Sequence, residues 1–111
     1  MQAMLQRPWH PRFKISVDIK VRSRTCGTMT GHTVDISESG VAAVVVTEVP
    51  VRELVELNFT LPFGPVRIYA MVRQRSAFRY GFQFVSSDCV PNVIHPTCRQ
   101  LEVEQLRQSE Q

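Results

Sequence analysis

Apolar and polar side chains alternate without interruption from residue 13 to residue 22. The apolar positions share one face, and they are Phe13, Ile15, Val17, Ile19 and Val21. Successive side chains of a β-strand point to opposite faces, so this period of two predicts a strand with one buried face and one wet face. Such a strand needs partners, and the chain is therefore expected to build a sheet or a barrel around it.

Five further segments carry strand patterns, and short turn-forming stretches separate them. The predicted strands cover residues 32–36, 41–47, 55–61, 66–73 and 80–84. The third predicted strand is unbroken and rich in β-branched residues, which indicates that both of its faces are covered. The stretches 24–31, 37–40 and 62–65 contain glycine, proline or small polar residues and are expected to be turns. Short connections favour antiparallel pairing and closure removes exposed edges, so we predict a mainly β, six-stranded antiparallel β-barrel.

The two ends of the chain depart from this pattern. Residues 1–12 include Pro8 and Pro11, which disfavour helix, and are expected to form a flexible N-terminal arm. Near the other end, Ile94, Cys98 and Leu101 have helical spacing, which predicts an amphipathic C-terminal helix that packs on the barrel. We therefore divide the chain into this arm, residues 1–12, and a barrel domain with its helix, residues 13–108.

The composition argues against several functional classes. The 111 residues carry a formal charge of +3 and have a pI near 9.1, a mildly basic balance that suits an anionic ligand. No apolar run approaches the ~20 residues of a membrane helix, and residues 1–11 lack the hydrophobic region of a signal peptide. We therefore expect a cytoplasmic protein without a membrane span, whose cysteines are reduced thiols. No nucleophile elbow, catalytic carboxylate pair, phosphate-cradling glycine loop or metal-ligand spacing is visible, so no enzyme, metal site or cofactor is predicted.

Two short motifs indicate a ligand site. An arginine stands directly before the first predicted strand, in His10-Pro11-Arg12-Phe13. A D-x-S-x-x-G pattern fills the turn after the second predicted strand, as Asp35-Ile36-Ser37-Glu38-Ser39-Gly40. Together with the later Tyr80-Gly81-Phe82-Gln83-Phe84, the order of these motifs resembles the PilZ domain family over about residues 7–100.

The resemblance implies a PilZ-like β-barrel with a C-terminal helix that binds the bacterial second messenger cyclic di-GMP. It places ligand contacts at Arg7, Arg12, Asp35, Ser37 and Gly40. It also implies that a stand-alone receptor of this kind transmits the signal to a protein effector, one that serves motility, adhesion or exopolysaccharide export.

The residue types at these positions suit a ligand with two guanines and two phosphates. An arginine fork can bind a phosphate, or the O6 and N7 atoms of guanine. Asp35, expected on the same face as Thr33 and Ser37, can accept hydrogen bonds from guanine N1 and N2. Gly40 permits a positive φ or close approach of a ligand. Trp9, on the arm, can stack on a guanine.

Other interpretations stay open at this point. The family motif has an arginine four residues before Arg12, where this chain has Pro8, so one cation is missing. A PilZ-fold adaptor that binds proteins, and binds cyclic di-GMP weakly or not at all, is therefore an alternative. Asp35, Ser37 and Gly40 can also form an ordinary turn. A barrel that binds single-stranded nucleic acid is disfavoured, because most aromatic residues fall on inward positions.

Overall fold

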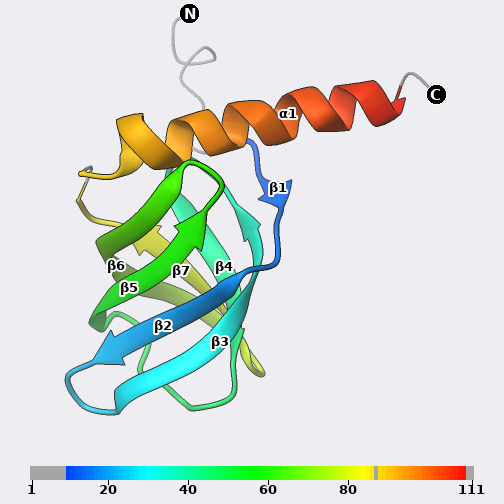
Figure 1. The fold of residues 1–111 in the computed structure, drawn as a ribbon. Coiled ribbons are helices and arrows are strands. Elements are labelled where there is room, and N and C mark those ends of the chain that lie inside the picture. Colours follow the sequence, from blue (N-terminus) through cyan, green and yellow to red (C-terminus); the bar gives the residue numbers. More distant parts are fainter. Residues whose placement is uncertain (1–9, 87, 110–111) are drawn as a thin grey trace, which may run out of the picture.

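The computed structural model describes residues 10–86 and 88–109, and this part of the chain forms seven strands and one long helix (Figure 1). The strands are β1 (Phe13–Lys14), β2 (Asp18–Ser23), β3 (Gly27–Ile36), β4 (Gly40–Val45), β5 (Leu54–Leu61), β6 (Gly64–Ser76) and β7 (Arg79–Phe84). A π-helical turn, Val90–Ile94, leads into the helix α1, His95–Ser109.

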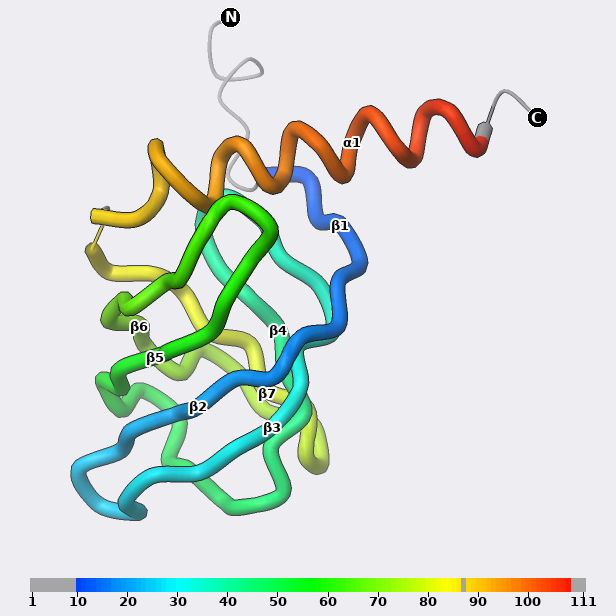
Figure 2. Tube along the Cα trace, in the orientation of Figure 1, coloured from blue at the N-terminus to red at the C-terminus, as the bar shows by residue number. Residues whose placement is uncertain are grey.

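Pairing between β3 and β4 closes the sheet. Neighbouring strands run antiparallel in the order β1-β3-β2-β5-β6-β7-β4, and β4 also pairs with β3. The strands β2 to β7 thus form a six-stranded antiparallel barrel, which the tube in Figure 2 follows from strand to strand. The short β1 lies outside this ring, paired with the end of β3. The predicted barrel with a C-terminal helix is confirmed.

The inward faces of the strands form one apolar core. Its fully buried members include Ile19, Val21, Leu57, Ile68 and Val72. Tyr80 is also buried, and its hydroxyl donates to the carbonyl of Thr47 at 3.0 Å and accepts from the amide of Val49 at 2.9 Å. A buried hydroxyl costs free energy unless it is paired, so these two bonds hold the connection after β4 against β7.

The first predicted strand is divided in two. The alternation of residues 13–22 is present, but regular strand pairing stops between β1 and β2 at residues 15–17, which keep single backbone hydrogen bonds to β3. Thr33 of β3 fastens this crossing segment, because its hydroxyl donates to the Ile15 carbonyl at 2.6 Å and accepts from the Val17 amide at 2.9 Å. The period of two correctly predicted which side chains of residues 13–22 face the core. It could not reveal this break, because the break depends on contacts with β3, which lies farther along the sequence.

Two further details of the predicted strands are wrong. The expected turn at residues 24–31 is much shorter, since β3 already begins at Gly27 and pairs with β2 from there. The run 41–47 is not covered on both faces, because Val44 and Val46 are 41% and 71% exposed. An all-apolar strand pattern therefore does not by itself establish burial of both faces.

The helix α1 crosses one end of the barrel, and its C-terminal half extends past the strands (Figure 1). The predicted spacing is confirmed at the packed end, where Ile94 and Cys98 are buried and Leu101 is half-buried. Burial raises the pKa of the Cys98 thiol to about 11. Farther along, Val103 and Leu106 are exposed. None of the helices found within residues 10–86 and 88–109 has the length and apolar character to cross a membrane.

Candidate functional site

A β-bulge in β3 sets the direction of the Asp35 side chain. β3 pairs Thr33 with Ala43 of β4, but pairs Asp35 with Ala42, so Val34 is an extra residue in the ladder. An extra residue shifts the alternation of side chains by one position. The inward-facing residues of β3 are therefore odd-numbered before Val34 and even-numbered after it.

This shift corrects the predicted face of the D-x-S-x-x-G motif. Thr33 and Ser37, which were expected to share a face with Asp35, are both buried. Ile36 is fully buried, as predicted, whereas the side chain of Asp35 keeps 15% of its surface exposed on the outside of the barrel. The carboxylate is thus the part of the motif that reaches an open surface from β3.

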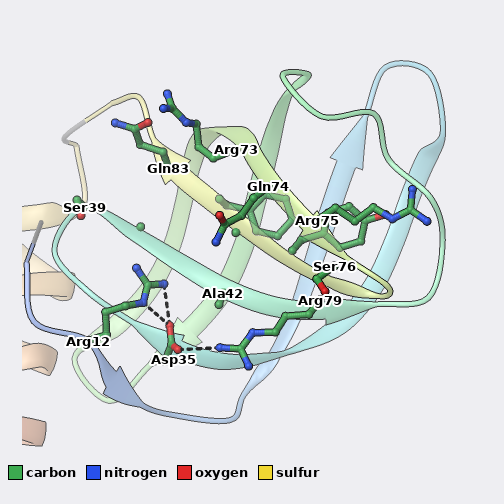
Figure 3. Close-up of a pocket in the computed structure, with 14 residues that line it drawn as sticks. Arg12, Asp35, Ser39, Ala42, Arg73, Gln74, Arg75, Ser76, Arg79 and Gln83 are labelled. Atoms are coloured by element: carbon green, nitrogen blue, oxygen red, sulfur yellow. Dashed lines mark hydrogen bonds and ion pairs between the residues drawn. The ribbon is translucent and has the colours of Figure 1, made fainter.

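Pairing of β1 with β3 brings the arginine motif to this carboxylate. Phe13 lies opposite Ile36 and Lys14 lies opposite Asp35, so Arg12, two residues before Lys14, lies diagonally across from the Asp35 carboxylate. The Nε and Nη2 atoms of Arg12 lie 2.8 Å and 2.7 Å from Asp35 Oδ1. From the other side, Nη2 of Arg79 lies 3.3 Å from Asp35 Oδ2. Figure 3 shows the two guanidinium groups pointing toward the same carboxylate from β7 and from the start of β1.

These three residues lie at the edge of an open hollow of about 740 Å³ on the outside of the barrel. Its walls come from the turn before β4, from β4 itself and from the hairpin of β6 and β7. Ligand pockets commonly have volumes of about 300–1,000 Å³, so the hollow is large enough for a nucleotide ligand.

Small residues form the floor of the hollow. Gly40, Ala42 and Gly81 all line it, and Ala42 of β4 pairs directly with Gly81 of β7. Larger side chains at Ala42 and Gly81 would reduce this space. Gly40 has a second role, because a Cβ atom there would lie 2.3 Å from the carbonyl oxygen of Phe82. The motif glycine therefore permits close approach of β7, whereas the sequence had suggested a positive φ or close approach of a ligand.

Positive charge dominates the described wall of the hollow. It holds four arginines, Arg12, Arg73, Arg75 and Arg79, against one carboxylate, that of Asp35. Glu48 lies just outside and pairs with Arg75 at 3.1 Å. The described residues thus leave an excess of positive charge that would attract an anion.

Ser37 stabilises the turn before β4 and does not line the hollow. Its hydroxyl is fully buried and accepts hydrogen bonds from the amides of Ser39 and Gly40, both at 3.2 Å. A serine that bonds to the following backbone stabilises a turn of this kind. Among the residues that the structure describes, Ser39 and Gly40 line the hollow and Ser37 does not.

The same turn is joined to the helix. Glu38 lies between the buried Ser37 and the lining residue Ser39, and its Oε2 atom is 3.0 Å from Nδ1 of His95. His95 is the first residue of α1. One side-chain contact thus connects the rim of the hollow with the start of the helix.

Not every predicted site residue can be placed. Arg7 and Trp9 lie outside the described residues. Conversely, the sequence did not single out Arg79 as a site residue. Alternation with the buried Tyr80 puts Arg79 on the outer face, but its meeting with Asp35 depends on β4 lying between β3 and β7. That strand order is not readable from local patterns.

A second cluster of charges lies on another part of the outer face. Glu56 of β5 accepts from Arg67 at 2.9 Å and from Arg22 at 3.3 Å, and the Arg67 hydrogen bond lowers the pKa of the Glu56 carboxyl. Arg24 lies in the same cluster, so this surface also holds more arginines than carboxylates. Within residues 10–86 and 88–109, no group of three or more His, Cys, Asp or Glu side chains is arranged to hold a metal ion.

Comparison with protein families matches the PilZ domain to residues 6–89, which include both motifs and all seven strands. The chain belongs to the PilZ domain family. Comparison with curated protein sequences gives no match. The family membership therefore rests on the domain profile and on the fold.

Solved PilZ structures share this fold at low sequence identity. The PilZ domain of YcgR from Escherichia coli, solved with c-di-GMP, is 16% identical with a TM-score of 0.66, over 96% of this chain and 99% of that one. The PilZ domain of CeSA from a cellulose-synthesizing bacterium is 17% identical with a TM-score of 0.65, over 81% and 97% of the two chains. MrkH of K. pneumonia, in its apo state, is 17% identical with a TM-score of 0.73 over 93% of this chain. The match spans 54% of the MrkH chain.

Proposed function

We propose that this PilZ domain binds cyclic di-GMP in the hollow beside Asp35 and passes the signal to a protein partner. The observation that carries the proposal is the meeting of Arg12 and Asp35, 23 residues apart, at 2.7 Å on the edge of a basic hollow of about 740 Å³. The two motifs that resemble the PilZ ligand site are thus adjacent in space. The YcgR domain, a relative in fold, was solved with c-di-GMP.

The chemistry of the residues assigns each of them a role. Asp35 accepts hydrogen bonds from the N1 and N2 donors of a guanine. Arg12 binds a phosphate oxygen or the O6 and N7 edge of the base. Ser37 and Gly40 act through the structure, the first by holding the turn and the second by letting β4 and β7 approach each other. Arg7 and Trp9 remain proposed contacts from the N-terminal side, by a phosphate bond and by stacking on a guanine.

The route to a partner starts at the rim of the hollow. A ligand contact at Ser39 would act on the turn that Glu38 joins to His95 of α1. Such local contacts can change how a neighbouring element is presented to another protein. The inhibitor of motility MotI/DgrA from Bacillus subtilis is a relative in fold, 17% identical with a TM-score of 0.64 over 96% of this chain and 53% of that one, which favours motility among the processes proposed.

Isothermal titration with cyclic di-GMP tests the proposal. Wild type should bind, and Arg12→Ala should weaken binding by about 10- to 100-fold, since a charge-assisted hydrogen bond contributes roughly 1.5–3 kcal/mol. Arg24→Ala removes the same charge from the turn between β2 and β3, outside the lining of this hollow, and should bind as wild type does. Absence of heat at high micromolar ligand for the wild type would leave the ligand-independent adaptor, with Pro8 in place of the motif arginine, as the function.

A further inference from the structure

We propose that Arg79 of β7 binds the dinucleotide as a second cation and performs the role of the arginine that the motif lacks at Pro8. This inference rests on the proposed binding of cyclic di-GMP. It adds a contact from the hairpin of β6 and β7, 44 residues after Asp35, which the two motifs do not include.

The position of Arg79 relative to Asp35 carries the proposal. Arg12 and Arg79 approach Asp35 from two sides, with Arg12 on Oδ1 and Arg79 on Oδ2 (Figure 3). The Asp35 side chain is only 15% exposed, whereas the Arg79 side chain is 57% exposed. The head group of Arg79 is therefore fixed at one oxygen atom and otherwise open to the hollow that it lines.

Binding of a guanine would redirect both arginines. The N1 and N2 donors of guanine require the two oxygens of Asp35, and these are the atoms that the arginines occupy in the free protein. The same ligand brings two phosphates, whose oxygens accept from guanidinium groups at least as well as a carboxylate does. In the free protein, the ion pairs with Asp35 thus hold both arginines beside the position that the ligand will take. When guanine replaces the arginines on Asp35, they become available to the phosphates.

The charge balance of the hollow supports a second cation. Of the four lining arginines, Arg75 is engaged elsewhere, because its Nε donates to the Ala77 carbonyl at 2.9 Å and its Nη2 donates to Glu48 at 3.1 Å. Asp35 offsets one more charge among the described residues. The remaining excess of two positive charges matches the two phosphates of the dinucleotide.

The backbone that carries Arg79 is well fixed. The β6–β7 turn is tied to β4 by a hydrogen bond from the Val45 amide to the Phe78 carbonyl at 2.9 Å. Arg79 itself pairs with Val44 of β4. A cation on such a hairpin is positioned before the ligand arrives, so little ordering is needed on binding.

The test is a titration with cyclic di-GMP of wild type, Arg79→Gln and Arg24→Gln. Arg79→Gln should raise the Kd by about 10- to 100-fold, the change expected for a lost charge-assisted hydrogen bond. Arg24→Gln is the control, because it removes the same charge from an exposed position outside the lining of the hollow, and its Kd should stay within about threefold of wild type. Melting curves should show that both variants fold, since Arg79→Gln loses an exposed ion pair and Arg24→Gln changes an exposed turn residue.

The Pro8→Arg substitution provides a second test. If Arg79 performs the role of the missing arginine, Pro8→Arg should tighten binding more in the Arg79→Gln protein than in the wild type, a coupling that a double-mutant cycle measures. Equal gains in both backgrounds, or an Arg79→Gln protein that binds as wild type does, would overturn the inference and leave the proposed function intact. A wild type without binding would overturn the proposed function itself.

Discussion

Replacement of the motif glycine by alanine should destabilise the barrel even when no ligand is present. A Cβ atom at Gly40 would lie 2.3 Å from the carbonyl oxygen of Phe82, where ordinary contacts begin near 3.4 Å. The blocking atom belongs to the backbone, so a side-chain rotation cannot relieve the clash. β4 and β7 must separate locally by about 1 Å, at a point where the Phe84 amide donates to the Ser39 carbonyl at 2.9 Å.

The size of the effect follows from this displacement. Inserting one carbon into a well-packed site typically costs about 1–3 kcal/mol. For a domain of this size, each kcal/mol lowers Tm by roughly 4–8 °C, so Gly40→Ala should melt about 4–24 °C below the wild type. Thermal melting followed by circular dichroism, with urea unfolding as a second measurement, provides the assay.

Gly81→Ala is the matched control on the strand opposite. A Cβ atom there would lie 3.0 Å from Cγ of Gln74, which is part of a flexible side chain. The change in stability should stay within about 1 kcal/mol, because alanine also restricts the unfolded chain. A Gly40→Ala protein that melts within about 2 °C of wild type would refute the reasoning. The glycine would then be needed for the ligand and not for strand packing.

Three further outcomes are expected. Ser37→Ala should lower the free energy of unfolding by about 1–3 kcal/mol in urea titrations, because two turn amides lose their buried acceptor. Since burial raises the pKa of Cys98 to about 11, mass spectrometry after iodoacetamide treatment at pH 8 should show Cys26 alkylated well before Cys98 in the folded protein. The hydrogen bond from Ser23 lowers the pKa of Glu53 below its ordinary value of 4.5. The ionised Glu53 thus stabilises the fold above pH 4.5, and this contribution is lost as the pH falls through the lowered pKa. In acid unfolding curves, the free energy of unfolding of Glu53→Gln should therefore fall less steeply with decreasing pH than that of the wild type.

Local patterns predicted most of the fold. Alternation identified the strands and their inward faces, because a half-buried strand must repeat every two residues. It placed Tyr80 and Phe82 inside the barrel and Ile94 and Cys98 on the packed face of the helix, and the structure confirms all four. The boundaries were less accurate, since the break between β1 and β2 is made by hydrogen bonds to a strand that lies far away in the sequence.

The candidate site was predicted in part. The motifs led to Arg12 and Asp35, which the structure brings together. The contribution of Arg79 could not be predicted, because it needs the order of β3, β4 and β7 in the barrel. Neither could the burial of Ser37, because its hydrogen bonds form only when the turn has closed. Local spacing shows which residues belong to a motif and leaves open which of them face a ligand.

The extra residue in β3 makes the chemistry of this surface depend on how the strand pairs as well as on residue type. If Val34 were held in a regular ladder, strict alternation from the buried Thr33 would turn the carboxylate of Asp35 into the apolar interior and Ile36 out to water. Loss of the single codon for Val34 would remove the bulge, and Asp35 would still take the outward position that follows Thr33. Gene variants that lack this residue should therefore keep the carboxylate at the surface.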